Sequence, residues 1–187
     1  MFLGFSENFY HLYDNLLFEY SLNSISLVLG VSFIVTIIGV TTAWLVTFFN
    51  FSGKKVFQWA LILPLAVPPY LLAYVFTEFF DYSGTANNFM RGLLSSESDI
   101  VFSPNIRTIY GAIAVFSFTL YPYVYMVARV AFMNISPSLI EASKLLGRNS
   151  ISTFFNLLIP LIRPAIIAGI ALVAMETLSD FGAVQHF

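Results

Sequence analysis

The chain has 187 residues, of which 58% are hydrophobic and 10% charged, whereas a soluble globular domain has about 25% charged residues. This composition excludes an ordinary soluble domain and indicates a membrane protein. The net charge of −2 argues against a nucleic-acid partner, and the absence of cysteine from these residues excludes disulfides, thiol catalysis and cysteine-based zinc sites.

Four apolar stretches are long enough to cross a bilayer, because a spanning helix needs about 20 mostly apolar residues. In chain order they lie within Leu22–Phe49, Val56–Phe80 and Ile109–Ala128, and from about Leu157 to Thr177. Pro160 and Pro164 leave the start of the fourth stretch open, since proline interrupts a helix. The sequence therefore predicts an all-α, polytopic membrane protein with about four spans.

Prolines interrupt two of these spans. Pro64, Pro68 and Pro69 fall within "LPLAVPPY" in the second, and Pro122 falls within "LYPYVY" in the third. Each removes a backbone donor, and in lipid the freed carbonyls need partners from neighbouring helices or a water-lined cavity. Two readings stay open: kinks that only shape the helices, or kinks beside a translocation path.

Basic residues are unevenly distributed between the connecting segments. If the first and third connections share one side of the membrane, six of the eight basic residues gather there: Lys54, Lys55, Arg129, Lys144, Arg148 and Arg163. The positive-inside rule makes that side cytoplasmic. The N-terminus and the polar 81–108 connection, with a short helix expected around Phe89–Leu94, then lie outside.

The 136–160 segment interrupts the apolar pattern with a short helix. Ser136 before Pro137 has the pattern of an N-cap and first turn; the alternative is a capping box from Ser138 to Glu141. Gly147 is placed as the C-terminal glycine of this helix. A second helical run is expected to begin near Ser150 and to lead into the fourth span.

Four side chains give the first of these helices an apolar face: Leu139, Ala142, Leu145 and Leu146. The helix could lie on the lipid surface, but such helices usually carry several basic residues on their polar face. Docking into a groove on a soluble partner is the better interpretation.

The spacing in this segment resembles the EAA loop of the permease subunits of binding-protein-dependent ABC importers. The chain has Glu141-Ala142-Ser143, then Gly147, and then "LLIP" ending at Pro160. The family pattern has alanine in place of Ser143. Three further stretches, "LILPLAVPPYLLAY", "LYPYVYMVARVAF" and "LSDFGAVQHF", resemble the ferric-iron-type branch.

The resemblance implies a type I (MetI-like) permease bundle in the bacterial inner membrane, with residues 1–187 forming a single permease domain and residues 136–160 its cytoplasmic coupling loop. A further span is expected downstream, so the chain is expected to be incomplete at its C-terminus. The implied partners are a cytoplasmic ATP-binding subunit, a periplasmic or extracellular solute-binding protein and a second permease half or copy.

The resemblance also assigns roles within the loop. Glu141, Ala142, Ser143, Gly147 and Pro160 would form the contact with the ATPase. The alternative for Glu141 is a solvated charge on a surface helix. The chain has no phosphate-binding G-x-x-x-x-G-K-[ST] sequence, so we expect no cofactor here and ATP on the partner subunit.

Glu176 and Asp180 are spaced as an i, i+4 pair near the end of the fourth span. Hard cations prefer oxygen ligands, so the pair is a weak candidate for a metal site; an interfacial pair, or one facing the external binding protein, is the simpler interpretation. The cargo alternatives to ferric iron are thiamine, a polyamine or another small solute. A secondary transporter without an ATPase and a membrane-embedded enzyme are the competing classes.

Overall fold

The computed structural model describes residues 17–80, 84–85, 88–89 and 108–180. Every element in this part of the chain is helical, which confirms the all-α prediction. The expected Phe89–Leu94 helix lies almost entirely outside the described residues. In chain order the elements are α2 (Leu17–Phe48), α3 (Lys54–Ala60), η2 (Leu63–Ala66), α4 (Pro69–Phe80), α6 (Ile109–Met133), α7 (Pro137–Leu145), α8 (Ser150–Thr153), η3 (Phe154–Leu158) and α9 (Ile159–Ser179).

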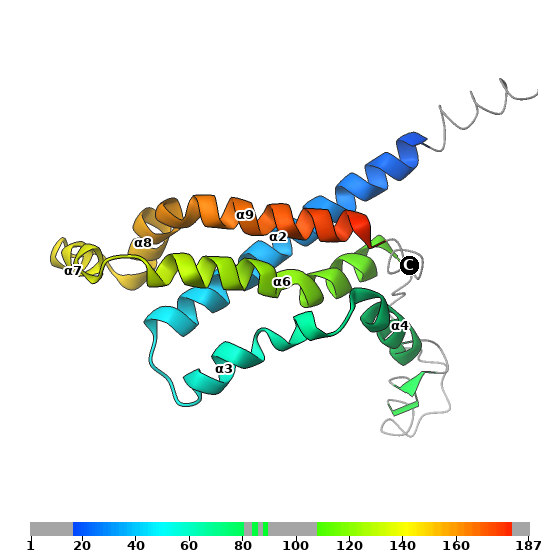
Figure 1. Ribbon diagram of the computed structural model, residues 1–187, viewed down its shortest axis with the longest axis horizontal. Helices are drawn as coiled ribbons and strands as arrows, with labels where there is room; N and C mark the ends of the chain where they lie inside the picture. The colour runs from blue at the N-terminus through cyan, green and yellow to red at the C-terminus, as the bar shows by residue number, and fades with distance from the viewer. Residues whose placement is uncertain (1–16, 81–83, 86–87, 90–107, 181–187) are drawn as a thin grey trace, which may run out of the picture.

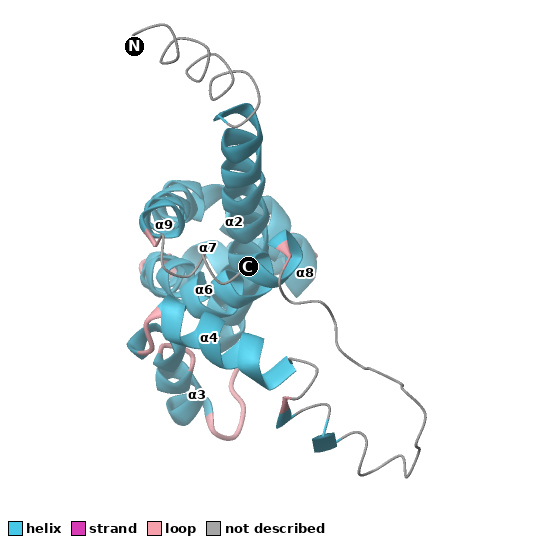
Figure 2. Cartoon of the chain, turned by 90° about the vertical axis from the view of Figure 1, so that its right-hand side faces the viewer, coloured by secondary structure: helices cyan, strands magenta, loops and turns pink. Residues whose placement is uncertain are grey.

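Helix α6 forms the centre of the bundle. It packs mainly against α2 and α9, and also against η2 and α4, and in Figure 1 it runs between α9 and α3. Figure 2 shows the same order from the end, with α2 and α9 on one side of α6 and α3 and α4 on the other. Each of the three long helical runs contains an apolar stretch of 18 residues. The buried share of this stretch is 61% in α6, 28% in α2 and 22% in the run Ser150–Ser179, which includes α9.

Glycines let both neighbours approach α6 closely. A Cβ atom on Gly39 of α2 would lie 2.9 Å from the backbone nitrogen of Tyr125 and 2.9 Å from the Cβ atom of Val124. A Cβ atom on Gly169 of α9 would lie 3.1 Å from the Cα atom of Val124. The backbone around Val124 therefore touches two helices, which is the packing that small residues allow in membranes.

The first and third expected spans are confirmed as single helices, α2 and α6. Helix α2 begins earlier than the sequence predicted, and α6 ends later, at Met133. Helix α6 continues through Pro122, which is buried inside it.

The second expected span is broken, so the prediction of one kinked helix was wrong. The segment Lys54–Ala66 and helix α4 meet at 88°. Pro64 and Pro68 lie between α3 and α4, and Pro69, adjacent to Pro68, is the first residue of α4. Two successive residues without an N–H cannot donate the backbone hydrogen bonds that would continue an α-helix. The backbone therefore turns here, through a 3₁₀ segment and an extended Val67 (φ −104°, ψ 121°).

The fourth expected span starts earlier than predicted. Residues Ser150–Ser179 form one apolar helical run of 30 residues, which passes through the π-helical turn η3. The amide of Ile159 donates to the carbonyl of Phe154, five residues back. This wider turn is how the helix accommodates Pro160, which has no N–H to donate.

The elements that carry most of the basic residues meet at one end of the bundle. Helices α7 and α8, the start of α3 and the ends of α2 and α6 lie together at one end, and α4 and the end of α9 lie at the other (Figure 1). The six basic residues that the sequence assigned to one side therefore belong to elements that meet at the same end. The side of the membrane that this end faces stays a prediction.

Candidate functional site

The candidate site is the α7–α8 segment. Helix α7 begins at Pro137 with Ser136 as its N-cap residue (φ −60°, ψ 131°), so the capping box beginning at Ser138 was the wrong alternative. The Ser136 side chain makes no capping bond to the backbone. Its hydroxyl instead lies 2.6 Å from that of Ser138.

Gly147 ends α7 in the way that the sequence predicted. Its φ is +76°, in the left-handed region that glycine adopts without steric cost. The amide of Arg148 donates to the carbonyl of Ser143 at 3.2 Å, and the amide of Gly147 to that of Lys144 at 2.9 Å. This pair of bonds is the Schellman motif. Apart from its two neighbours in the chain, no described residue has an atom within 4 Å of the position that a Cβ atom on Gly147 would take, so backbone conformation and not packing requires glycine here.

A hydrogen bond joins the two helices across this turn. Asn149 is the N-cap of α8, and its side-chain oxygen accepts from the amide of Ser152 at 2.7 Å. The hydroxyls of Ser143 and Thr153 lie 2.8 Å apart and are buried. The serine that replaces the family's alanine is thus the residue that fastens α7 to α8.

The outer face of α7 is apolar and uncovered within the described part of the chain. Leu139 is 44% exposed, Leu145 89% and Leu146 79%, and Ala142 is exposed as well. The inner face is formed by Ser143, which is buried, and by the half-buried Ile140. An exposed group of large apolar side chains at helical spacing is typical of a surface that meets a partner.

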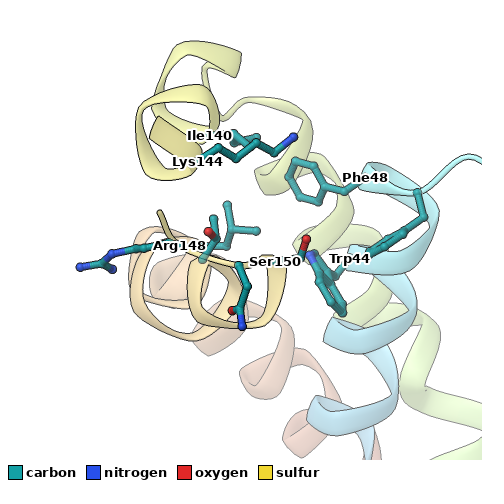
Figure 3. Close-up of a pocket in the computed structure, with 10 residues that line it drawn as sticks. Trp44, Phe48, Ile140, Lys144, Arg148 and Ser150 are labelled. Carbon is teal, nitrogen blue, oxygen red and sulfur yellow. The ribbon is translucent and has the colours of Figure 1, made fainter. Parts of the chain in front are cut away.

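Under α7 lies a cavity of about 460 Å³ between this segment and the end of α2. Trp44 and Phe48 line one wall, and Trp44 also stacks near Phe154 with ring centroids 4.5 Å apart. Figure 3 shows Lys144 extending toward Phe48, while Arg148 extends away from the aromatic side chains. The aromatic side chains at the end of α2 therefore lie against the α7–α8 segment, on the side of the cavity.

The structure brings the predicted coupling residues into one segment but gives them different surroundings. Glu141 and Ala142 are exposed, whereas Ser143 is buried. Pro160 lies in the first turn of α9, and α8 and η3 separate it from the turn at Gly147. Their contact with an ATPase stays a prediction.

Sequence reasoning missed three supporting residues. Thr153 and Asn149 could have been found from the pairing of small hydroxyl residues across the glycine turn and from the Asn before a helical run. Trp44 gave no signal, because its contact with Phe154 joins residues far apart in the chain.

The proline break forms a second cavity, of about 270 Å³, toward the other end of the bundle. Pro68 and Pro69 line it, and so do Tyr123 and Glu176. Pro64 and Pro122 are not among its lining residues. Whether any of the four prolines borders a translocation path stays a prediction.

The weak metal-site candidate gains no support from the described residues. Among them, no group of three or more His, Cys, Asp or Glu side chains lies together. Glu176 lines the cavity at the proline break, whereas Asp180 is not among the residues described as lining it.

Comparison with known proteins places the chain in a family. Residues 18–185 match the family model described as "Binding-protein-dependent transport system inner membrane component", so the chain belongs to that family. It is therefore a membrane component of a transport system, in agreement with the family resemblance of the α7–α8 segment.

Three curated relatives illustrate the range of this family. The molybdenum transport system permease protein ModB of Escherichia coli (strain K12) is 31% identical over 80% of this chain and 62% of its own length. The sulfate transport system permease protein CysT of Salmonella typhimurium is 27% identical over 79% and 50%. The spermidine/putrescine permease protein PotB of Escherichia coli (strain K12) is 27% identical over 94% and 62%. The chain thus spans half to three-fifths of the length of these relatives.

Proposed function

We propose that the chain is the permease subunit of an ATP-driven, binding-protein-dependent importer, with the α7–α8 segment as the lever that a separate ATPase moves. The observation that carries this proposal is the apolar outer face of α7, held in place by the Schellman turn at Gly147 and the bond between Ser143 and Thr153. A segment that only reversed the chain would need neither a fastened turn nor exposed leucines.

The mechanism follows from how the segment is attached. Helix α8 continues through η3 into α9 as one helical run, so a displacement of α7 is passed to α9 through the Ser143–Thr153 bond and the glycine turn. Helix α9 packs on α6 at Gly169. In the proposal, ATP binds and is hydrolysed on the partner subunit, and the motion it drives reaches the spans by this route.

The partners follow from the same proposal. They are a cytoplasmic ATP-binding subunit at the α7 end of the bundle, a solute-binding protein at the opposite end, and a second permease half or copy completing the path in the bacterial inner membrane. The family description, which names a binding-protein-dependent system, supports the first two in general terms.

The cargo is a small solute. Ferric iron rests on the resemblance of stretches such as "LILPLAVPPYLLAY". The relatives reported above are named for sulfate, molybdenum and spermidine/putrescine transport and not for iron, which supports the alternative of a cargo other than iron.

The test is association of the whole protein with its ATPase in detergent. Changing Leu145 and Leu146 together to Glu places two charges on the apolar face and should abolish co-purification of the ATPase and with it transport. Leu22→Glu is the matched control, since Leu22 is 53% exposed on α2, toward the other end of the bundle. Size-exclusion chromatography establishes that each variant is folded. Unchanged association and transport in the double variant would reject the lever.

A further inference from the structure

The cavity at the proline break has a chemical character that bears on the cargo. It lies where η2 turns into α4, against the middle of α6 and the last turn of α9, and has a volume of about 270 Å³. Its lining includes Leu65 and Val67 from the break, Thr119 and Tyr123 from α6, and Glu176 from α9. Three separate parts of the chain thus contribute to one space.

Several hydrogen-bond acceptors belong to this lining, among mostly apolar side chains. The carbonyl of Leu65 would bond in a helix to the amide three or four residues on, but both positions, Pro68 and Pro69, lack an N–H. The hydroxyl of Thr119 donates its proton to the carbonyl of Val115 at 2.9 Å, so only its lone pairs remain for a ligand.

Glu176 adds a negative charge to these neutral acceptors. It is half-buried in the last turn of α9, and it lines the cavity together with Tyr123 of α6. The described lining residues include neither Lys, Arg nor His. Because ionisable residues within membrane segments are costly, their presence beside a cavity marks a functional site.

We infer that this cavity is a stop on the path of a positively charged cargo; the inference rests on the proposed function, since it requires that the chain form a permease. A carboxylate among carbonyl, hydroxyl and phenol oxygens attracts an ammonium group, which has three donors and no acceptor. It also attracts a hard metal cation, because such cations prefer oxygen ligands. A sulfate or molybdate anion would meet like charge and few donors.

The arrangement also fits the requirement for release. With one carboxylate, and without a third metal-ligating side chain among the described residues, the cavity holds a cation weakly. A transport site has to bind well enough to admit the solute and weakly enough to let it leave. The same cavity lies at the 88° break between η2 and α4, where a change in the bend would alter its size.

The first test measures the charge preference of the cavity without knowledge of the cargo. These 187 residues contain no cysteine, so Val67→Cys introduces a thiol at a lining position that is 37% exposed. In the whole transporter, with any cysteine elsewhere replaced, the thiol is labelled by a trimethylammonium and by a sulfonate methanethiosulfonate reagent. The ratio of the two rates should fall by about tenfold when Glu176→Gln is added, because one unit charge in the lining of the same cavity is removed.

The controls separate this effect from a general change in surface charge. Glu78→Gln removes an exposed carboxylate of α4 that is not among the described lining residues, and it should leave the ratio unchanged. Ala66→Cys, also in the lining, replaces Val67→Cys if that variant does not fold. An equal ratio with Glu and Gln at position 176 would overturn the inference.

The second test identifies whether the positively charged cargo is an ammonium compound or a metal ion. Cells carrying the whole transport system are offered labelled spermidine, ferric iron, sulfate and molybdate. Uptake of spermidine or of iron that Glu176→Gln reduces at least tenfold, while Glu78→Gln does not, supports a cation and says whether it is an ammonium or a metal. Uptake of sulfate or molybdate would overturn the inference but leave the proposed function intact, whereas failure of the leucine test on α7 would remove the proposed function itself.

Discussion

Helices α6 and α7 follow each other in the chain but differ in how far their apolar side chains are buried. Helix α6 is apolar, and about half of its side chains are buried between α2, α9 and the η2–α4 break. Helix α7 has apolar side chains too, yet Leu145 and Leu146 are 89% and 79% exposed. The comparison shows that hydrophobicity alone does not mark the core of this protein. The decisive property is whether a neighbouring backbone comes close enough to cover the side chain.

The largest effect is expected where a neighbouring helix comes closest to the backbone of α6. Gly39→Ala puts a Cβ atom 2.9 Å from the Tyr125 backbone nitrogen, and overpacking of this kind costs about 1–3 kcal/mol. We expect a lower unfolding temperature in detergent. Gly30→Ala is the control, because the atoms that a Cβ would meet there belong to the flexible side chain of Ile113. Equal losses in the two variants would contradict the close contact at Gly39.

The next effect concerns the turn that ends α7. Gly147→Ala forces an alanine into φ +76°, which costs about 1–2 kcal/mol for a residue with a Cβ atom. Gly147→Asn should cost less, since Asn tolerates this conformation. Hydrogen exchange at the Arg148 amide, which bonds to the Ser143 carbonyl, measures the loosened turn. Equal exchange in both variants would show that φ is not the constraint.

A smaller effect is expected from the bond that fastens α7 to α8. Ser143→Ala leaves the buried Thr153 hydroxyl without this partner and should cost about 1 kcal/mol. Thr153→Val should cost a similar amount, and the double variant less than the sum, since the bond is lost only once. Chemical unfolding of the four proteins gives the coupling energy. Strict additivity would show that the hydroxyl pair does not stabilise the segment.

The smallest effect on stability is expected on the outer face of α7. Leu145→Ala removes a side chain that is 89% exposed, and such surface substitutions usually change stability by less than about 0.5 kcal/mol. Gly39→Ala, at the close contact between α2 and α6, should cost about 1–3 kcal/mol by comparison. Thermal unfolding of the two variants side by side measures the difference; a large loss for Leu145→Ala would mean that α7 is packed against its own chain.

Much of the candidate site could be predicted because its signals are local. Pro137, Gly147 and the start of α8 at Ser150 follow from caps and turn chemistry, which involve only neighbours in sequence. The Ser143–Thr153 bond could not be predicted in the same way, because it depends on the angle at which α8 leaves the turn. The cavity at the proline break was also missed, since it needs η2, α6 and α9 to meet.

The sequence by itself determined that the chain is helical and membrane-spanning, and that a glycine-ended helix interrupts the apolar pattern, because composition, helical periodicity and backbone chemistry are properties of short stretches. Only the tertiary structure decided that the second span breaks by 88°, that α6 is the buried centre, and that Glu176 and Tyr123 line the same cavity. Those features depend on how far apart the helix axes lie, and that distance is set by contacts between residues remote in sequence, such as Gly39 and Gly169 with Val124.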